Sequence, residues 1–190
     1  KMRKYQSSPV QTLSNEFLRL LGYYIAEGHC SHKKYLTISS GDQEIISDIA
    51  KTLESLNLKW KKRLSRKYDY QISSSFWSEI ISELCGDNSK NKHLPHFWPQ
   101  LSNEQLSQLL KAYFSADGGT ENTIISCTTA SKELASDIMY ALLRFGIIAR
   151  LRKRNNKIPN KNIRESYFTV SISGKKFLET FQKRISFSLK

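Results

Sequence analysis

The sequence predicts an α+β protein built from two similar halves that are related by a pseudo-two-fold axis. Three observations predict it: a nine-residue segment that occurs twice, further matches that follow in the same order, and the same succession of helical and β patterns in each half. At 190 residues the chain is as long as one ordinary domain, whereas two separate units would each bury too little apolar surface. We therefore expect the halves to share an interface.

The repeated segment runs from Leu20 to Gly28 as LLGYYIAEG and returns from Leu110 to Gly118 as LKAYFSADG. Its acids are 90 residues apart, but the next match, Ser-Asp-Ile, recurs after 89 residues, so the second half has lost one residue. The loop after the first strand is the natural place for this deletion. The last match recurs after 100 residues, which predicts an insertion of about eleven residues between the last two strands of the second half. We assign the repeats to 11–85 and 103–182 and a linker to 86–102.

Each half is predicted to fold as helix, strand, strand, helix, strand, strand, helix, because apolar residues first recur at helical spacing and then alternate. Ser102 followed by Gln105 predicts a capping box at the start of the fourth helix. Gly28 and Gly118 predict helix ends in the left-handed conformation. In the last strand of each half, the following residues are expected to face the core: Tyr68, Tyr70, Ile72, Phe168, Val170 and Ile172.

The charge of the chain predicts a polyanionic partner. Thirty Lys and Arg against 17 Asp and Glu give a net charge of +13 and a pI of about 9.7. No basic amphipathic helix stands out, so nucleic acid is favoured over a membrane surface. No apolar run approaches the ~18 residues of a membrane span, no secretory signal is visible, and the three cysteines form no CxxC pair that would predict a zinc site. We expect a protein that is not secreted, in the cytoplasm or nucleoid of a prokaryote or in an organelle.

Cations share one face of a predicted strand in both halves. Arg150, Arg152 and Arg154 alternate in the second half, as do Lys59, Lys61 and Arg63 in the first. One such face is often simply solvated, but its recurrence at equivalent positions favours a nucleic-acid surface. The residues expected to contact DNA are Lys59, Lys61, Arg63, Arg66, Lys67, Asp69, Gln71, Ser73, Arg150, Arg152, Arg154, Lys157, Lys161, Arg164, Thr169 and Ser171.

The repeated segment also suggests a metal site. Small residues four apart on one helix face let two helices approach closely, and the residues concerned are Gly22, Ala26, Ala112 and Ala116. Glu27 and Asp117 then meet at the helix ends, where the dipole and the neighbouring charge both disfavour an anion. A divalent cation would resolve this, and oxygen ligands suit Mg²⁺ or Mn²⁺. For one copy, ordinary helix packing and a chance acid would be the simpler explanation; two copies favour the site.

The paired segments resemble the signature of LAGLIDADG homing endonucleases in their two-repeat, single-chain form. The resemblance implies an αββαββα fold in each half, a saddle of two antiparallel sheets in the DNA major groove, and cleavage of both strands of a long double-stranded target. The single-chain form implies a monomer. Because the halves differ, the target should be only loosely palindromic.

By position, the resemblance makes Glu27 and Asp117 the catalytic and metal-binding acids, with Ala26 and Ala116 beside them in the metal site. It assigns the helix interface to Gly22, Ala26, Ala112 and Ala116. Many members place a Lys or Gln beside the metals near the end of the second strand. Gln43 and Lys132 are the candidates here, although both also fit the start of the following helix.

Three alternatives stay open. The fold also occurs in regulators that bind DNA without cutting it, although such proteins are expected to lack an acid and both acids are present here. An intron RNA maturase could use another part of the surface. An intein context is disfavoured, since the chain has no Cys or Ser at position 1 and no terminal His-Asn pair, but excision from an intein is left open.

Overall fold

The computed structural model describes residues 12–31, 34–63, 66–121, 123–157 and 164–186. The first repeat comprises α1 (Asn15–Glu27), β1 (Gly28–Ser31), β2 (Tyr35–Ser39), α2 (Gln43–Ser55), β3 (Trp60–Lys62), β4 (Asp69–Ile72) and α3 (Ser75–Cys85). A 3-10 helix, η1 (Trp98–Gln100), precedes the second repeat. That repeat comprises α4 (Asn103–Asp117), β5 (Gly118–Glu121), β6 (Ile124–Thr129), α5 (Lys132–Arg144), β7 (Arg150–Lys157), β8 (Arg164–Ser173) and α6 (Lys175–Arg184). The predicted α+β class and element order are confirmed.

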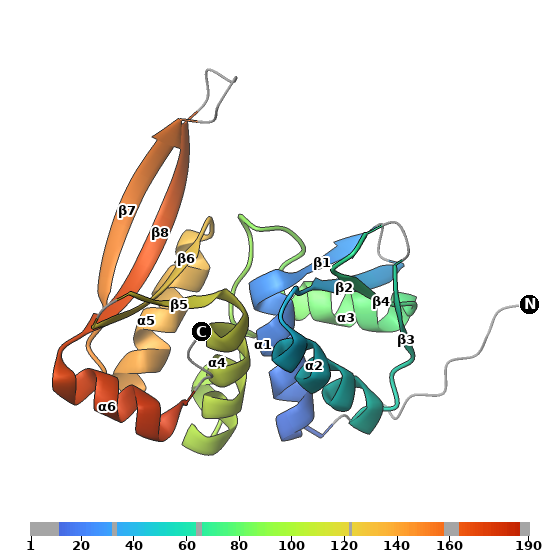
Figure 1. Cartoon of the computed structure of the whole chain (residues 1–190), viewed down its shortest axis with the longest axis horizontal. Helices are drawn as coiled ribbons and strands as arrows, with labels where there is room; N and C mark the ends of the chain where they lie inside the picture. The colour runs from blue at the N-terminus through green and yellow to red at the C-terminus, as the bar shows by residue number, and fades with distance from the viewer. Residues whose placement is uncertain (1–11, 32–33, 64–65, 122, 158–163, 187–190) are drawn as a thin grey trace, which may run out of the picture.

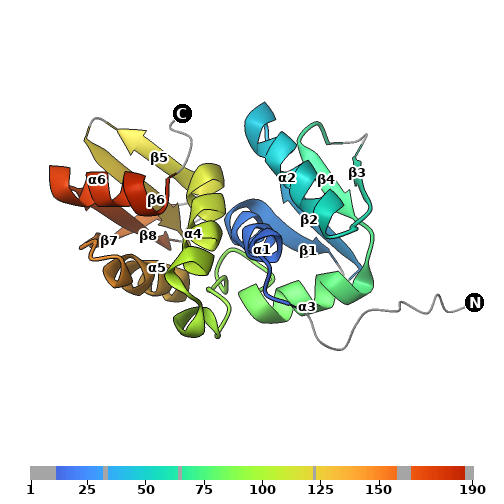
Figure 2. The ribbon, with the colours of Figure 1, turned by 90° about the horizontal axis from the view of Figure 1, so that it is seen from below.

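Each repeat forms one antiparallel four-stranded sheet, with the orders β1-β2-β4-β3 and β5-β6-β8-β7. Figures 1 and 2 show α1 and α4 side by side in the middle of the molecule, with one sheet to either side. The connection between the first two strands spans residues 32–34 in the first repeat and 122–123 in the second. The lost residue therefore lies where the repeat offsets predicted it.

The predicted insertion lengthens the last two strands of the second repeat. β7 and β8 contain 8 and 10 residues, whereas β3 and β4 contain 3 and 4. In Figure 1 the β7–β8 ribbon rises well beyond the rest of the molecule. The two sheets thus share a topology but present surfaces of different length.

The two central helices are buried on almost all sides. Leu18, Leu21 and Tyr24 of α1 and Leu110 and Tyr113 of α4 are completely buried. They belong to one apolar cluster that continues into both sheets, so the halves share a core as expected. Ser14 caps α1, and the predicted capping box of α4 is present: Ser102 Oγ accepts from the Gln105 N–H at 3.1 Å and Gln105 Oε1 accepts from the Ser102 N–H at 3.0 Å.

Two sequence expectations are wrong. Gly28 and Gly118 are extended, with φ of −94° and −78°, because each helix runs directly into a strand instead of turning back. Glycine is still required there, since a Cβ at Gly28 would lie 2.6 Å from the Tyr24 carbonyl oxygen. Tyr68 is 50% exposed although it was expected in the core, because β4 begins one residue later and Tyr68 lies in the preceding turn. Tyr70, Ile72, Phe168, Val170 and Ile172 are buried as expected.

The linker is bound to both repeats. Tyr24 Oη donates to the Gly86 carbonyl oxygen at 2.7 Å, and Ser131 Oγ donates to the Lys92 carbonyl oxygen at 2.6 Å. The Leu94 N–H donates to Asp137 Oδ2 at 3.0 Å. Because these bonds reach α1 in one repeat and α5 in the other, the linker helps to hold the halves in register. In the described part of the chain, no helix is long and apolar enough to cross a membrane.

The close packing of α1 and α4 at Gly22 leads to a prediction about stability. A Cβ at Gly22 would overlap the Leu109 carbonyl oxygen and lie 2.8 Å from Ala112 Cβ. Gly22→Ala should therefore lower the free energy of unfolding by about 1–3 kcal/mol, even though alanine is the better helix former. Gly119→Ala is the control, because nothing lies within 4 Å of a Cβ there, and it should stay within about 0.5 kcal/mol of wild type. Equal urea midpoints for the two variants would contradict close packing at Gly22.

Candidate active site and DNA-binding face

The repeated acids come together at the joint of the two repeats. Glu27 is the last residue of α1 and Asp117 the last of α4, and the close packing of the two helices sets their ends side by side. Both acids line one cavity of about 520 Å³, together with linker residues, β6 and β8. The structure thus brings together the two residues that the sequence predicted as a pair.

The electrostatics of this cavity favour a bound cation. The pKa of Asp117 is raised to about 7, mainly by burial and also by the negative charge of Glu27, while a hydrogen bond opposes the shift. In that bond Tyr113 Oη donates to Asp117 Oδ2 at 3.0 Å. Glu27 is exposed by comparison. The negatively charged form of Asp117 is therefore unfavourable at this position, and a nearby positive charge would stabilise it.

The available donors fit a hard divalent ion. Among the described residues, no three His, Cys, Asp or Glu side chains are grouped so that they could hold a metal by themselves. An ion between Glu27 and Asp117 would therefore draw further oxygen ligands from water, from phosphate, or from main-chain carbonyls such as those of Ala26 and Ala116. Mg²⁺ and Mn²⁺ accept such sets, and Mg²⁺ in particular is commonly bound by one or two carboxylates plus substrate phosphates.

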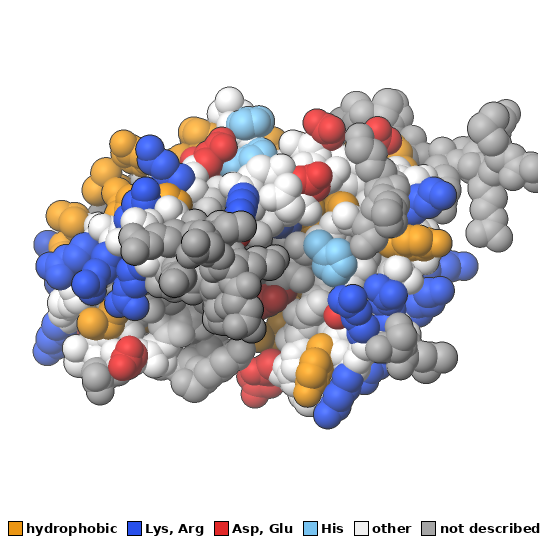
Figure 3. Space-filling model, turned by 90° about the horizontal axis from the view of Figure 1, so that it is seen from above, with side chains coloured by type: hydrophobic (Ala, Val, Ile, Leu, Met, Phe, Trp, Pro, Cys, Tyr) orange, Lys and Arg blue, Asp and Glu red, His pale blue; other side chains and the backbone are white. Residues whose placement is uncertain are grey.

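Cations flank the cavity on both sheets. Arg150, Arg152 and Arg154 are exposed and lie opposite Ser171, Thr169 and Tyr167 of β8, so these side chains share one face. In the first repeat Lys61 lies opposite Gln71, and Lys59, Arg66, Lys67 and Ser73 are exposed beside the same two strands. Figure 3 shows Lys and Arg gathered over both ends of the molecule, with acidic and His side chains between them. Lys161 and the side chains of Lys157 and Arg164 lie outside the described residues.

Asp69 differs from the other residues expected to contact DNA. It is on the outward face as expected, but its side chain is buried, with only 6% of the residue exposed. Ser39 Oγ donates to Asp69 Oδ1 at 2.8 Å, and the Nη1 atoms of Arg63 and Arg66 each lie 3.9 Å from Oδ2. The Asp69 carboxylate therefore interacts with neighbouring side chains of the same repeat.

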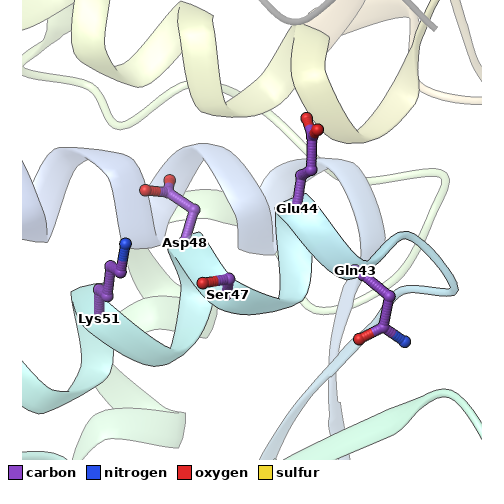
Figure 4. Close-up of a pocket in the computed structure, with 5 residues that line it drawn as sticks. All are labelled: Gln43, Glu44, Ser47, Asp48 and Lys51. Carbon is purple, nitrogen blue, oxygen red and sulfur yellow. The ribbon is translucent and has the colours of Figure 1, made fainter.

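The structure does not bring Gln43 and Lys132 to the acids. Both are exposed first residues of helices, α2 and α5, and neither lines the cavity. Figure 4 shows Gln43 at the start of α2, directed away from Glu44 and Asp48. The N-caps Asp42 and Ser131 begin the helices soon after β2 and β6 end, so the two positions belong to helices.

The repeated Ser-Asp-Ile segment has a structural role. Asp48, which lines a shallow hollow on α2 (Figure 4), pairs with Arg19 and accepts a hydrogen bond from Tyr23 Oη, both on α1. The equivalent Asp137 instead accepts from the linker at Leu94. Each repeat therefore uses this acid to tie its second helix to the centre of the molecule.

Two linker lysines had no signal in the sequence, because their polar surroundings resemble a solvated loop. Lys92 is only 3% exposed and lines the cavity; its Nζ donates to the Tyr24 carbonyl oxygen at 2.9 Å, and burial lowers its pKa to about 7. Lys90 Nζ pairs with Glu165 Oε1 of β8 at 2.8 Å, and Tyr167 Oη donates to the same carboxylate at 3.0 Å. The linker is thus part of the cavity wall.

Comparison with known families agrees with this geometry, because residues 14–83 and 104–186 each match the LAGLIDADG-like domain. The chain belongs to that family. Two replication factor C small subunits are similar to it. That of Methanocaldococcus jannaschii is 36% identical over 92% of this chain and 10% of its own length; that of Thermococcus kodakarensis is 31% identical over 88% and 19%. The LAGLIDADG chain thus spans a tenth to a fifth of these relatives.

Solved structures show the same fold at low sequence identity. Full-length DUF199/WhiA from Thermotoga maritima has a TM-score of 0.65 at 13% identity, over 97% of this LAGLIDADG chain and 58% of its own. A variant of the homing endonuclease I-DmoI has a TM-score of 0.64 at 13% identity, over 93% and 98%. The fold is therefore shared by a homing endonuclease and by WhiA.

The raised pKa of Asp117 predicts how stability depends on pH without metal. The folded protein holds the Asp117 proton up to about pH 7, whereas the ordinary pKa is 3.8, so the free energy of unfolding should fall as pH rises between these values. The contribution is at most about 1.4 kcal/mol per pH unit. Asp117→Asn removes it, so in EDTA this variant should gain stability over wild type as pH rises from 4 to 7.

Urea unfolding at several pH values in EDTA measures this difference. Glu121→Gln, at an exposed acid in β5, is the control and should follow wild type. A constant difference in the free energy of unfolding between Asp117→Asn and wild type across this pH range would contradict the raised pKa of the buried Asp117 carboxyl.

Proposed function

We propose that the chain is a divalent-metal-dependent, site-specific endonuclease that cuts both strands of DNA through one site shared by its two repeats. The observation that carries the proposal is the pair of acids, Glu27 and Asp117, at the joined ends of α1 and α4. Anions at helix C-termini, beside each other and facing DNA phosphates, are unfavourable for folding and for binding alike. A reaction that requires a bound cation explains why two acids occur at this position.

The residues divide the work by position. Cations on the β7–β8 ribbon and on β3 bind phosphates on either side of the cavity and set the scissile bonds over it. Glu27 and Asp117 supply one charged oxygen ligand from each repeat. When bound between these acids, a divalent ion would supply an activated water and stabilisation of the leaving oxygen for phosphodiester hydrolysis. Because the sheets differ in length, we propose a long and only loosely palindromic target.

The comparisons support this proposal in two ways. The homing endonuclease I-DmoI, which shares the fold, has been crystallised with DNA and Mn. Relatives of the chain also include proteins with unrelated names, such as a glutamine–fructose-6-phosphate aminotransferase of Methanocaldococcus jannaschii, 29% identical over 98% of this chain and 18% of its own length. One segment within proteins of different function is the pattern that an inserted, mobile element leaves. It favours an origin within a host protein, including an intein.

DNA binding without cleavage is the second candidate. The fold is shared with WhiA, which is not named as an endonuclease, and this likeness favours it. Under this reading the two acids serve the helix joint only.

Substitution of the acids separates the two candidates. Glu27→Gln and Asp117→Asn keep the size of each side chain but remove one charged ligand, so each should lower double-strand cleavage at least about 10²-fold. Binding in EDTA should hold or improve, because an anion facing phosphates is lost. Cleavage is measured in Mg²⁺ on a target selected from randomised duplexes, and binding by gel shift.

Glu121→Gln, at a nearby exposed acid, should leave cleavage unchanged and is the control. Cleavage at near wild-type rate by either acid variant would show that the shared site is wrong. Loss of binding in EDTA by both variants would make the acids structural and favour the second candidate.

A further inference from the structure

One position on the outward faces carries a carboxylate in the first repeat and a hydroxyl in the second. Aligning Gln71–Ser73 with Ser171–Ser173 places Asp69 at the position of Thr169. The cross-strand partners are also equivalent, since Ser39 pairs with Asp69 and Thr128 pairs with Thr169. In the second repeat the pair is two hydroxyls with their Oγ1 atoms 3.0 Å apart. In the first, one of the two is a carboxylate.

The carboxylate engages the cations of its own face. Arg63 and Arg66 each place Nη1 at 3.9 Å from Asp69 Oδ2, and the Asp69 side chain is only 9% exposed. Oδ2 makes no hydrogen bond within the described residues, so the charges of the two guanidinium groups are what stabilise it. These two arginines therefore offer less free positive charge to a phosphate than their number indicates.

The second repeat lacks this compensation. Arg152, which corresponds to Arg63, lies opposite Thr169. Arg150, Arg152 and Arg154 are exposed, and none has a carboxylate within 4 Å in the described part of the chain. Their ribbon is also the longer one. The second-repeat arginines are thus uncompensated within the described residues and sit on the longer ribbon, whereas the equivalent first-repeat arginines share a carboxylate.

We propose that Asp69 makes the repeats unequal DNA-binding surfaces: it neutralises part of the charge of Arg63 and Arg66, so these arginines contribute less to the salt-dependent affinity for double-stranded DNA than Arg150 and Arg152 of the β7–β8 ribbon. The inference rests on the DNA-binding part of the proposed function and is independent of cleavage. Electrostatic affinity follows the number of phosphates neutralised, which appears as the slope of log affinity against log salt.

Asp69→Asn tests the proposal directly, because it keeps the acceptor for Ser39 and removes the charge that holds the arginines. Binding to a random-sequence duplex is measured in EDTA between 50 and 200 mM salt. Release of one or two cations should steepen the slope by about 0.9–1.8, so the affinity of the variant should fall about 3- to 12-fold further than that of wild type over this range. Glu79→Gln is the control, on α3, which packs on β1 and β2, and it should leave the slope unchanged.

Two double variants provide a second test that does not require Asp69→Asn to fold. Arg150→Gln with Arg152→Gln should reduce the slope by about 1.8, and Arg63→Gln with Arg66→Gln by less than about 0.9. Equal losses for the two pairs, or an unchanged slope for a folded Asp69→Asn, would overturn the proposal. Wild type that binds DNA without cutting it contradicts the endonuclease alone, whereas wild type that binds no duplex at low salt overturns both.

Discussion

The close contact of α1 and α4 at Gly22 is the constraint on which the rest of the structure depends. With no side chain at this position, the helix backbones approach until Gly22 meets Leu109 and Ala112. That approach fuses the two apolar layers into one core, which neither half is large enough to provide alone. It also brings the ends of the two helices together, and therefore places two acids at one point. The same contact between α1 and α4 therefore accounts for the shared core and for the position of the two proposed catalytic acids.

The charge at this point is managed unequally in the two repeats. Lys92 places a buried ammonium on the Tyr24 carbonyl oxygen in the last turn of α1 and over the Tyr24 ring, 3.1 Å from its centroid. A cation is favourable at a helix C-terminus. The end of α4 instead relies on Tyr113, which donates to Asp117. The two carboxylates are therefore chemically distinct, although the repeats that carry them are similar.

The structural features that depend on local sequence patterns could be predicted from the sequence. The repeat, the element order, the capping box at Ser102 and the pairing of Glu27 with Asp117 all follow from spacing and from the repetition itself. Features that depend on tertiary contacts were not predictable. Lys92 looked like a linker lysine because nothing nearby in the sequence shows that α1 covers it, and Asp69 looked exposed because its partners come from another strand and a turn. Gln43 and Lys132 could not be assigned to strand or helix from the sequence, because strand ends are uncertain by a few residues; the structure places them at the starts of α2 and α5.

The most direct test of the shared site is to locate the metal itself in crystals of the protein with a bound DNA target and Mn²⁺. We expect anomalous density at the joint of α1 and α4, within about 2.0–2.2 Å of a carboxylate oxygen from each of Glu27 and Asp117. Density near only one acid, density elsewhere on the protein, or none at saturating Mn²⁺ in a complex that holds DNA over the cavity would contradict it.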